Sequence, residues 1–158
     1  MPPSPSAGLL LYRSVGRDRI EVLLVHPGGP FWARKDEHAW SIPKGEYQPG
    51  DDPLSAAERE FAEELGTEPP AGDRIELGEI KQPSRKLVRA WAVEGDLDPG
   101  GITSNTFDME WPRGSGRVRS FPEVDRAAWF DLATARTKLH TGQVPFVEKL
   151  IVALAKDP

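Results

Sequence analysis

The stretch from Trp40 to Thr67 constrains the fold more than any other part of the sequence, because it contains a helix with both of its ends marked. Asp52 can cap the first turn, and Pro53 suits the first helical position. Gly66 can end the helix in a left-handed turn. At 3.6 residues per turn, one side of this helix is apolar and consists of Leu54, Ala57, Phe61 and Leu65. The pattern predicts a helix that packs one face against a core.

The other side of the predicted helix gathers three carboxylates. Glu60, Glu63 and Glu64 are spaced i, i+3 and i+4, so they share an arc of about 100°. Carboxylates this close repel one another unless a cation lies among them, and such oxygen ligands suit Mg²⁺ or Mn²⁺. Arg59 stands four residues before Glu63 and can pair with and orient that carboxylate. The alternative is a solvated acidic helix face, which is common.

Together with the Pro-Lys-Gly turn before the helix, these residues resemble the Nudix box of the Nudix hydrolases, written GX5EX7REUXEEXGU with U a bulky aliphatic residue. The positions that match are Gly45, Arg59, Glu60, Glu63, Glu64 and Gly66. Asp51 stands where the first Glu belongs, and Phe61 and Thr67 replace aliphatic residues. In the family, the position of Asp51 supports the loop more than it binds metal. The resemblance implies hydrolysis of a nucleoside diphosphate linked to a further group.

The resemblance also implies a metal site. Glu60, Glu63 and Glu64, with the carbonyl oxygen of Lys44, are the expected ligands of Mg²⁺ or Mn²⁺. A polyphosphate carries charge that must be neutralised before water attacks phosphorus, and divalent ions do this. Arg59 is expected to act as an orienter of carboxylates and not as a proton donor, because arginine stays protonated.

Residues outside the box are expected to complete the site and to set its specificity. Aromatic side chains can stack on a base, and cations can bind phosphates. The substrate-binding candidates are Trp32, Arg34, Lys35, Lys44, Arg85 and Trp111. For each tryptophan the alternative is ordinary packing. A general base is expected in a later loop, at Glu110 or the nearby Asp108, with Glu60 as the rival.

A local cue ranks the substrates. The run from Trp40 to Gly45, WSIPKG, is similar to the W-x-x-P-K-G sequence of Nudix hydrolases that act on diadenosine polyphosphates. Dinucleoside polyphosphates are therefore the first expectation, nucleoside triphosphates the second and nucleotide sugars the third. A catalytically silent, nucleotide-sensing module is the alternative, although a sensor needs no metal cluster. A diphosphate isomerase of the same fold would need a cysteine in its site, and the chain has none.

Composition narrows the class of protein. A chain of 158 residues with 38% hydrophobic and 28% charged residues suits one globular domain. The formal net charge of −5 argues against general nucleic-acid binding, and against duplexes in particular, which need a basic stripe. Without a signal-like start or a long apolar run, we expect a cytoplasmic location and no membrane partner. The sequence leaves the oligomeric state open.

The pattern along the chain predicts an α/β fold. Residues 1–6 are expected to be a flexible lead, and residues 7–158 a single domain. Strands are expected at Ala7–Tyr12, Ile20–His26, Trp40–Ile42, Ile75–Gln82, Lys86–Val93 and Thr106–Trp111. A polar loop is expected at Pro112–Arg119, and later helices at Asp131–Leu139 and Val144–Ala155. The Nudix resemblance implies an α/β/α sandwich, in which a mixed sheet has the box helix on one side and the C-terminal helices on the other.

Overall fold

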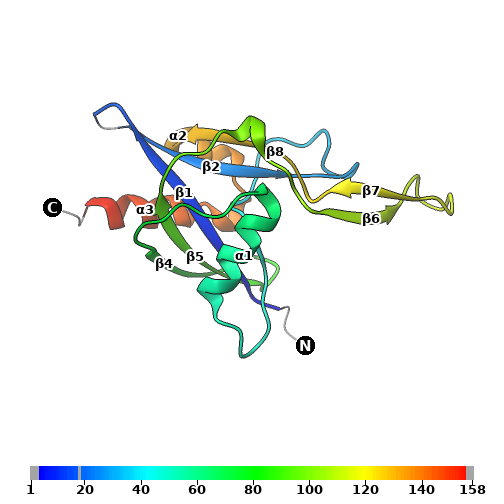
Figure 1. Cartoon of the computed structure of the whole chain (residues 1–158), viewed down its shortest axis with the longest axis horizontal. Helices are drawn as coiled ribbons and strands as arrows, with labels where there is room; N and C mark the ends of the chain where they lie inside the picture. Colours follow the sequence, from blue (N-terminus) through cyan, green and yellow to red (C-terminus); the bar gives the residue numbers. More distant parts are fainter. Residues whose placement is uncertain (1–3, 18, 156–158) are drawn as a thin grey trace.

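A six-stranded mixed sheet lies at the centre of the computed structural model, which describes residues 4–17 and 19–155 (Figure 1). The strands are β1 (Ser6–Val15), β2 (Arg19–Pro27), β3 (Lys44–Glu46), β4 (Ile75–Lys81), β5 (Leu87–Glu94), β6 (Thr106–Glu110), β7 (Val118–Pro122) and β8 (Val124–Asp131). The helices are α1 (Pro53–Leu65), α2 (Leu132–Lys138) and α3 (Pro145–Ala155), with short 3₁₀ turns at Pro99–Gly101 and Thr141–Gln143. The strand order is β4-β5-β1-β2-β8, and β3 pairs with β1.

Strand β1 organises the sheet because its two halves have different neighbours on one edge. Its first half pairs with β3, with Gly8 opposite Lys44, and its second half pairs with β2, with Tyr12 opposite Val22. On its other edge β1 runs parallel to β5. The antiparallel β1–β2 and parallel β1–β5 pairings make the sheet mixed, as expected. The residues just before the predicted box helix are thereby fixed to the central strand.

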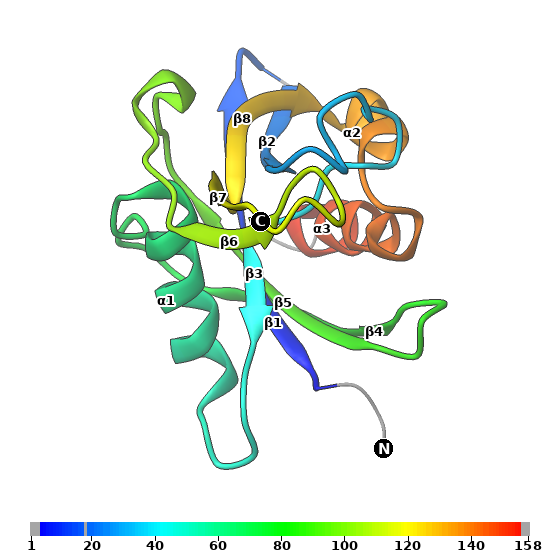
Figure 2. The same ribbon diagram turned by 90° about the vertical axis from the view of Figure 1, so that its right-hand side faces the viewer.

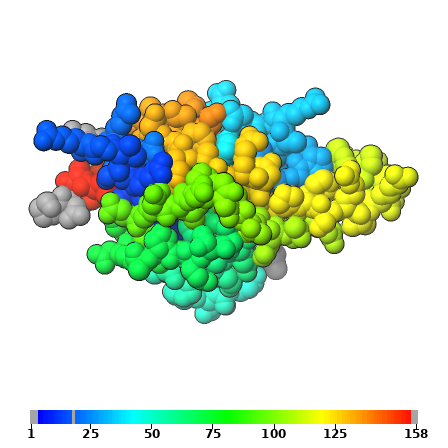
Figure 3. Space-filling model, turned by 45° about the horizontal axis from the view of Figure 1, so that its top comes forward, coloured from blue at the N-terminus to red at the C-terminus, as the bar shows by residue number. Residues whose placement is uncertain are grey.

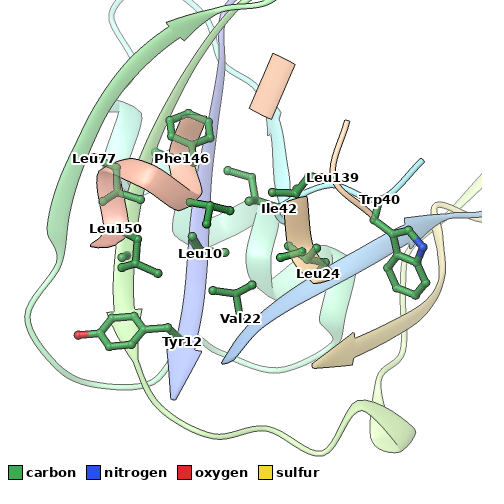
Figure 4. Close-up of a cluster of buried hydrophobic side chains, with 14 of the residues drawn as sticks. Leu10, Tyr12, Val22, Leu24, Trp40, Ile42, Leu77, Leu139, Phe146 and Leu150 are labelled. Atoms are coloured by element: carbon green, nitrogen blue, oxygen red, sulfur yellow. The ribbon is translucent and has the colours of Figure 1, made fainter. Parts of the chain in front are cut away.

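Helices cover both faces of the sheet, and this confirms the predicted sandwich (Figure 2). Successive side chains of a strand point to opposite faces. Leu9 and Leu11 of β1 belong to one buried cluster with Phe61 of α1. Leu10 belongs to the other buried cluster with Phe146 of α3 (Figure 4). No helix among the described residues is long and apolar enough to cross a membrane.

The N-terminal end of the sheet differs from the expectation. Strand β1 begins at Ser6, which is fully buried and pairs with Glu46 and Val88, so the last residue of the expected lead belongs to the sheet. The backbone of Pro5 also takes part, since its carbonyl accepts from the Tyr47 N–H at 3.0 Å. Of that lead, Met1–Pro3 lie outside the described residues.

The strand expected at Trp40–Ile42 was placed too early in the chain. Trp40 and Ser41 form only isolated bridges, and the regular strand is β3, Lys44–Glu46. Pro43 explains the interruption because proline has no N–H for the ladder. Its carbonyl still accepts from the Leu9 N–H at 3.1 Å, so the segment stays attached to β1.

Two strands near the C-terminus were not predicted. The polar loop expected at Pro112–Arg119 runs into β7, and the segment that follows it is β8. Strands β6 and β7 form a separate two-stranded ribbon that projects from one end of the molecule (Figure 1). Strand β8 pairs with β2 along most of its length but carries Ala127 and Ala128 in place of a regular alternation. Its place is decided by pairing with β2 and not by its own pattern.

Candidate active site

Helix α1 has the ends that the sequence predicts. The Asp52 side chain accepts from the Ser55 N–H at 3.1 Å, and Pro53 is the first helical residue. Gly66 adopts a φ of 74° and donates its N–H to the carbonyl of Ala62. The apolar side is seated on the sheet, where Phe61 is fully buried. Because both ends and one face are fixed, the acidic side of the helix is held in a defined place.

Gly45 lets α1 approach the sheet closely at Glu60. A Cβ atom at Gly45 would lie 2.0 Å from the Glu60 Cδ and 2.3 Å from its Oε2, so a side chain there would displace the Glu60 carboxylate. The carboxylate of Glu60 therefore occupies the space above the Gly45 backbone. Burial raises the pKa of Glu60, and the negative charges of Glu63 and Glu123 raise it further.

Glu64 is the most perturbed carboxylate of the group. Burial raises its pKa to about 8, and the negative charges of Glu60 and Glu123 add to this shift. The charge of Lys44 and a hydrogen bond from the Lys44 backbone N–H act in the opposite direction. Burial also lowers the pKa of Lys44, whose side chain lies among these acids. A half-buried acid and a half-buried lysine thus share one small polar site.

Arg59 contacts a different partner from the one that the helical spacing suggested. Its guanidinium Nη2 lies 3.6 Å from the Glu60 Oε1, whereas the spacing had paired it with Glu63. The Arg59 side chain is 52% exposed, so this ion pair is weak. Glu63 is held through its backbone, because its carbonyl accepts from the Asn105 N–H at 2.9 Å. This bond ties α1 to the segment that enters β6.

Glu123 completes the acidic cluster, and it is not among the site residues predicted from the sequence. It lies between β7 and β8, with its N–H donated to Asn105 and its carbonyl accepting from Gly28, at 2.8 and 2.9 Å. Its charge reaches both Glu60 and Glu64. A usable signal was present in the sequence, since Pro122-Glu123 interrupts two apolar-containing runs. Without recognising β7 and β8 as strands, that signal could not be placed.

Two hollows adjoin at Glu123. The first, of about 110 Å³, contains two of the acids, Glu64 and Glu123, whereas Glu60 and Glu63 lie outside its lining. Its lining consists of Val25, Pro27, Ser41, Lys44, Glu64, Glu123 and Val124. The second, of about 390 Å³, is largely apolar and includes the aromatic side chains of Phe31, Trp32 and Phe107. The rest of its lining consists of Pro27, Gly28, Gly29, Met109 and Glu123. Pro27 and Glu123 belong to both linings. We call them the acidic hollow and the aromatic hollow.

The structure brings some of the predicted substrate-binding residues together there. Lys44 lines the acidic hollow, and Trp32 lines the aromatic hollow. Lys35 lies beside the aromatic hollow, with its Nζ 3.7 Å from the centre of the Phe31 ring. Arg34 is exposed on the same loop.

The other predicted residues lie elsewhere. Arg85 is in the turn between β4 and β5 and lines neither hollow. Glu110 stands at the end of β6, where its Oε1 accepts from the Gly114 N–H at 2.7 Å, and it lines neither hollow. Trp111 follows it in the chain and also lies outside both linings. Of the later carboxylates, the structure places Glu123, and not Glu110, beside Glu64.

The loop before α1 is braced by the residue that departs from the box pattern. The Asp51 Oδ2 accepts from the Gln48 N–H at 3.1 Å, and the Asp51 N–H donates to the Gln48 carbonyl at 3.0 Å. The shorter aspartate therefore supports the loop, as the family pattern implies for this position.

The donor chemistry of the acidic hollow fits a hard divalent cation, although the side chains are not pre-arranged around one. Among the described residues, no three His, Asp or Glu side chains are grouped ready to hold a metal ion. Burial and mutual repulsion nevertheless raise the pKa values of Glu60 and Glu64, and a cation would relieve this repulsion. Carboxylate and carbonyl oxygens are the ligands that Mg²⁺ and Mn²⁺ prefer.

Comparison with known proteins supplies the family. The family model for the NUDIX domain matches residues 2–150. An RNA pyrophosphohydrolase of Rhodospirillum rubrum is 39% identical over 166 aligned residues, which cover 98% of this chain and 93% of the relative.

Solved structures share the fold. An Ap4A hydrolase of C. elegans in a binary complex superposes with a TM-score of 0.65 at 21% identity, covering 95% of this chain and 98% of that one. The NUDIX domain of Shewanella oneidensis NrtR, complexed with ADP ribose, gives a TM-score of 0.64 at 16% identity, covering 98% and 90%. The box on α1, the family match and the identity to the Rhodospirillum rubrum protein all agree. This chain therefore belongs to the Nudix family and is a Nudix pyrophosphohydrolase.

Proposed function

We propose that the chain hydrolyses a pyrophosphate bond of a nucleoside polyphosphate, with the base in the aromatic hollow and the phosphates in the acidic hollow. The observation that carries this proposal is the pair of hollows that share Glu123 and Pro27. A nucleotide has an aromatic end and an anionic end, and the two hollows offer matching chemistry side by side. Trp32 and Phe31 can stack on a base, which is worth about 1–3 kcal/mol by analogy with single-strand binding.

The phosphate end needs a cation, because an acidic hollow repels a polyphosphate. We propose that Glu60, Glu63, Glu64 and the Lys44 carbonyl hold Mg²⁺ or Mn²⁺. When bound, the ion neutralises phosphate charge and polarises the bond under attack. Glu64 gives up the proton that its raised pKa favours, so ion binding and proton release are linked. Arg59 orients Glu60, with which it pairs.

Glu123 is the better placed proton acceptor. Its backbone is fixed at both the N–H and the carbonyl, and its exposed side chain lines the two hollows where base and phosphates meet. A general base must lie within hydrogen-bond reach of the attacking water. Glu123 can take the proton from that water on a carboxylate oxygen.

Two substrate classes are the leading candidates for this arrangement. The WSIPKG run favours a dinucleoside polyphosphate, and nucleoside triphosphates and nucleotide sugars follow in that order. The name of the Rhodospirillum rubrum relative favours the 5′-polyphosphate end of an RNA. Both share the nucleoside polyphosphate that the two hollows accommodate.

Steady-state kinetics test the proposal. We expect kcat/KM for diadenosine tetraphosphate or a 5′-triphosphorylated RNA to exceed that for ADP-ribose by at least about tenfold, or 1.4 kcal/mol. We also expect no turnover in EDTA. Turnover that does not depend on Mg²⁺ or Mn²⁺ would refute the metal site. Nucleotide binding without turnover in their presence would identify the alternative, a sensing module.

A further inference from the structure

The β6–β7 ribbon has two chemically different faces. Directly opposite residues of an antiparallel pair project to the same face, as does every second residue along each strand. The register pairs Phe107 with Phe121 and Met109 with Arg119, and the Trp111 N–H bond to the Arg117 carbonyl at 2.9 Å continues it. One face, which we call the pocket face, therefore consists of Phe107, Met109, Trp111, Arg117, Arg119 and Phe121. The ribbon's two acids, Asp108 and Glu110, lie on the opposite face.

The pocket face continues the wall of the aromatic hollow. Phe107 and Met109 line that hollow, and the Phe107 ring lies against Gly29 in the opposite wall, 3.0 Å from the place of a Cβ there. The rings of Phe107 and Phe121 are 6.0 Å apart. Figure 3 shows the ribbon, in yellow-green to yellow, projecting from the same end of the molecule as the loop of residues 31–39, in cyan.

The arginines of the ribbon carry positive charges that are not paired with carboxylates of the described residues. None of the ion pairs within residues 4–17 and 19–155 includes Arg113, Arg117 or Arg119. The Arg119 guanidinium instead lies 5.8 Å from the centre of the Phe121 ring. Although the chain has a net charge of −5, this face combines aromatic rings with unpaired arginines. Rings and cations interleaved in this way are typical of surfaces that bind single-stranded nucleic acid.

The acidic hollow, the aromatic hollow and the ribbon follow one another, and this order decides which part of a substrate can contact the pocket face. The acidic hollow adjoins the aromatic hollow at Pro27 and Glu123, and the ribbon residues Phe107 and Met109 line the aromatic hollow but not the acidic one. Trp111 lies four residues beyond Phe107, about 13 Å at roughly 3.3 Å per residue. The second nucleoside of a dinucleoside polyphosphate would lie beyond the phosphates. A group that continues past the nucleoside on its other side is attached through the ribose 3′ oxygen.

We propose that the pocket face binds the nucleotides that follow the first one in a single-stranded RNA with a 5′-polyphosphate end. Trp111 stacks on one of these bases, and Arg117 and Arg119 bind the phosphates that link them. The inference rests on the proposed function for the position of the first nucleotide. It adds a length of RNA to the substrate and assigns the ribbon as the surface that recognises it.

Chain length provides the test. We compare kcat/KM for ATP with that for 5′-triphosphorylated di- and trinucleotides, at a fixed excess of Mg²⁺. The trinucleotide should be preferred to ATP by about tenfold or more. Trp111→Ala, and Arg117→Ala combined with Arg119→Ala, should each lower this preference by about fivefold or more. The arginine variant should also make the preference less dependent on salt, by about 0.7 in the logarithmic slope for each phosphate that it no longer binds.

Matched controls separate recognition from folding. Arg17→Ala removes an exposed arginine in the β1–β2 turn, at the opposite end of the molecule, and Val118→Ala shortens an exposed side chain on the ribbon's other face. Both controls should keep the preference for the trinucleotide. Annealing a complementary strand should remove the preference, because paired bases cannot stack on Trp111.

A binding measurement separates the test of the ribbon proposal from the test of the catalytic proposal. The anisotropy of a 3′-labelled triphosphorylated trinucleotide, with ATP as competitor, measures the same preference when no turnover occurs. If the wild type prefers the trinucleotide here but hydrolyses no nucleotide, the proposed function fails and the ribbon surface stands. Equal affinity for ATP and the trinucleotide overturns the ribbon proposal. Loss of the preference in either control variant overturns it as well.

Discussion

Helix α1 and the β6–β7 ribbon meet at one site but are built in opposite ways. The helix is capped by Asp52, ended by Gly66 and seated on the sheet through Phe61, so its acids are held from three directions. The ribbon leaves the main sheet and is joined mainly to itself. On our proposals, the metal-binding acids lie on the packed element, whereas a surface that selects a longer substrate lies on the projecting one.

The largest effect is expected from removing the charge of Glu64, the α1 carboxylate with the most perturbed pKa. Glu64→Gln should lower kcat by about 10²-fold or more on every substrate, because the metal supplies several kcal/mol of charge stabilisation. The preference for a longer RNA in binding should remain, since the ribbon is untouched. Glu58→Gln serves as the matched control on the same helix. Glu58 lies outside the hollow, and its Oε1 is 2.9 Å from the Arg74 Nε. Equal rates for wild type and Glu64→Gln would remove the metal site from the mechanism.

The second prediction sets the two later carboxylates against each other. Glu123→Gln should lower kcat by about 10- to 10²-fold, because general-base catalysis supplies about 10²- to 10⁴-fold. Glu110→Gln is expected to change kcat little, since the structure places Glu110 at the end of β6 and outside both hollows. The opposite result would restore the base that the sequence alone suggested.

A third variant tests how tightly the packed element constrains its acids. Gly45→Ala places a methyl group 2.0 Å from the Glu60 Cδ, so Glu60 must leave its position or α1 must move. We expect about tenfold lower apparent affinity for Mg²⁺, and a loss of about 1 kcal/mol or less in the free energy of unfolding, because the displaced atoms are the end of a flexible side chain. Gly101→Ala is the control, because no atom lies within 4 Å of its added Cβ. Metal titrations and thermal unfolding measure the two effects separately.

The last effect concerns protons and is confined to the metal-free protein. The raised pKa of Glu64, about 8 when folded, means that the folded state holds a proton more tightly than the unfolded state. This contribution is fully present below the ordinary glutamate value and is lost as the pH rises through about 8. Glu64→Gln should therefore gain stability relative to wild type between pH 5 and pH 8.5, on the order of a few kcal/mol. Thermal unfolding of both proteins in EDTA, at pH 5 and at pH 8.5, measures this gain. A stability difference that is the same at the two pH values would contradict the raised pKa of Glu64.

The sequence predicts the two regions unequally, for physical reasons. Helical spacing by itself places the α1 acids on one side, because they lie within one turn of each other. The face that carries Trp111 depends on register with a strand that was not predicted, so no local pattern reveals it. Arg59 illustrates the limit even on the helix, since spacing allowed Glu63 whereas the structure brings it to Glu60. Glu123 lies near Glu64 only because β8 returns to pair with β2.

That return of β8 has a consequence for how the chain can fold. Strand β2 lies between β1 and β8, with Leu23 opposite Trp129, and its second partner comes about a hundred residues after it. Pairings between such distant segments form slowly because a long loop must close first. During synthesis, the unpaired edge of β2 would therefore stay open until almost the whole chain had left the ribosome. Folding of this enzyme is then completed only when its final quarter has been synthesised. Chains truncated in that quarter should aggregate instead of keeping partial activity.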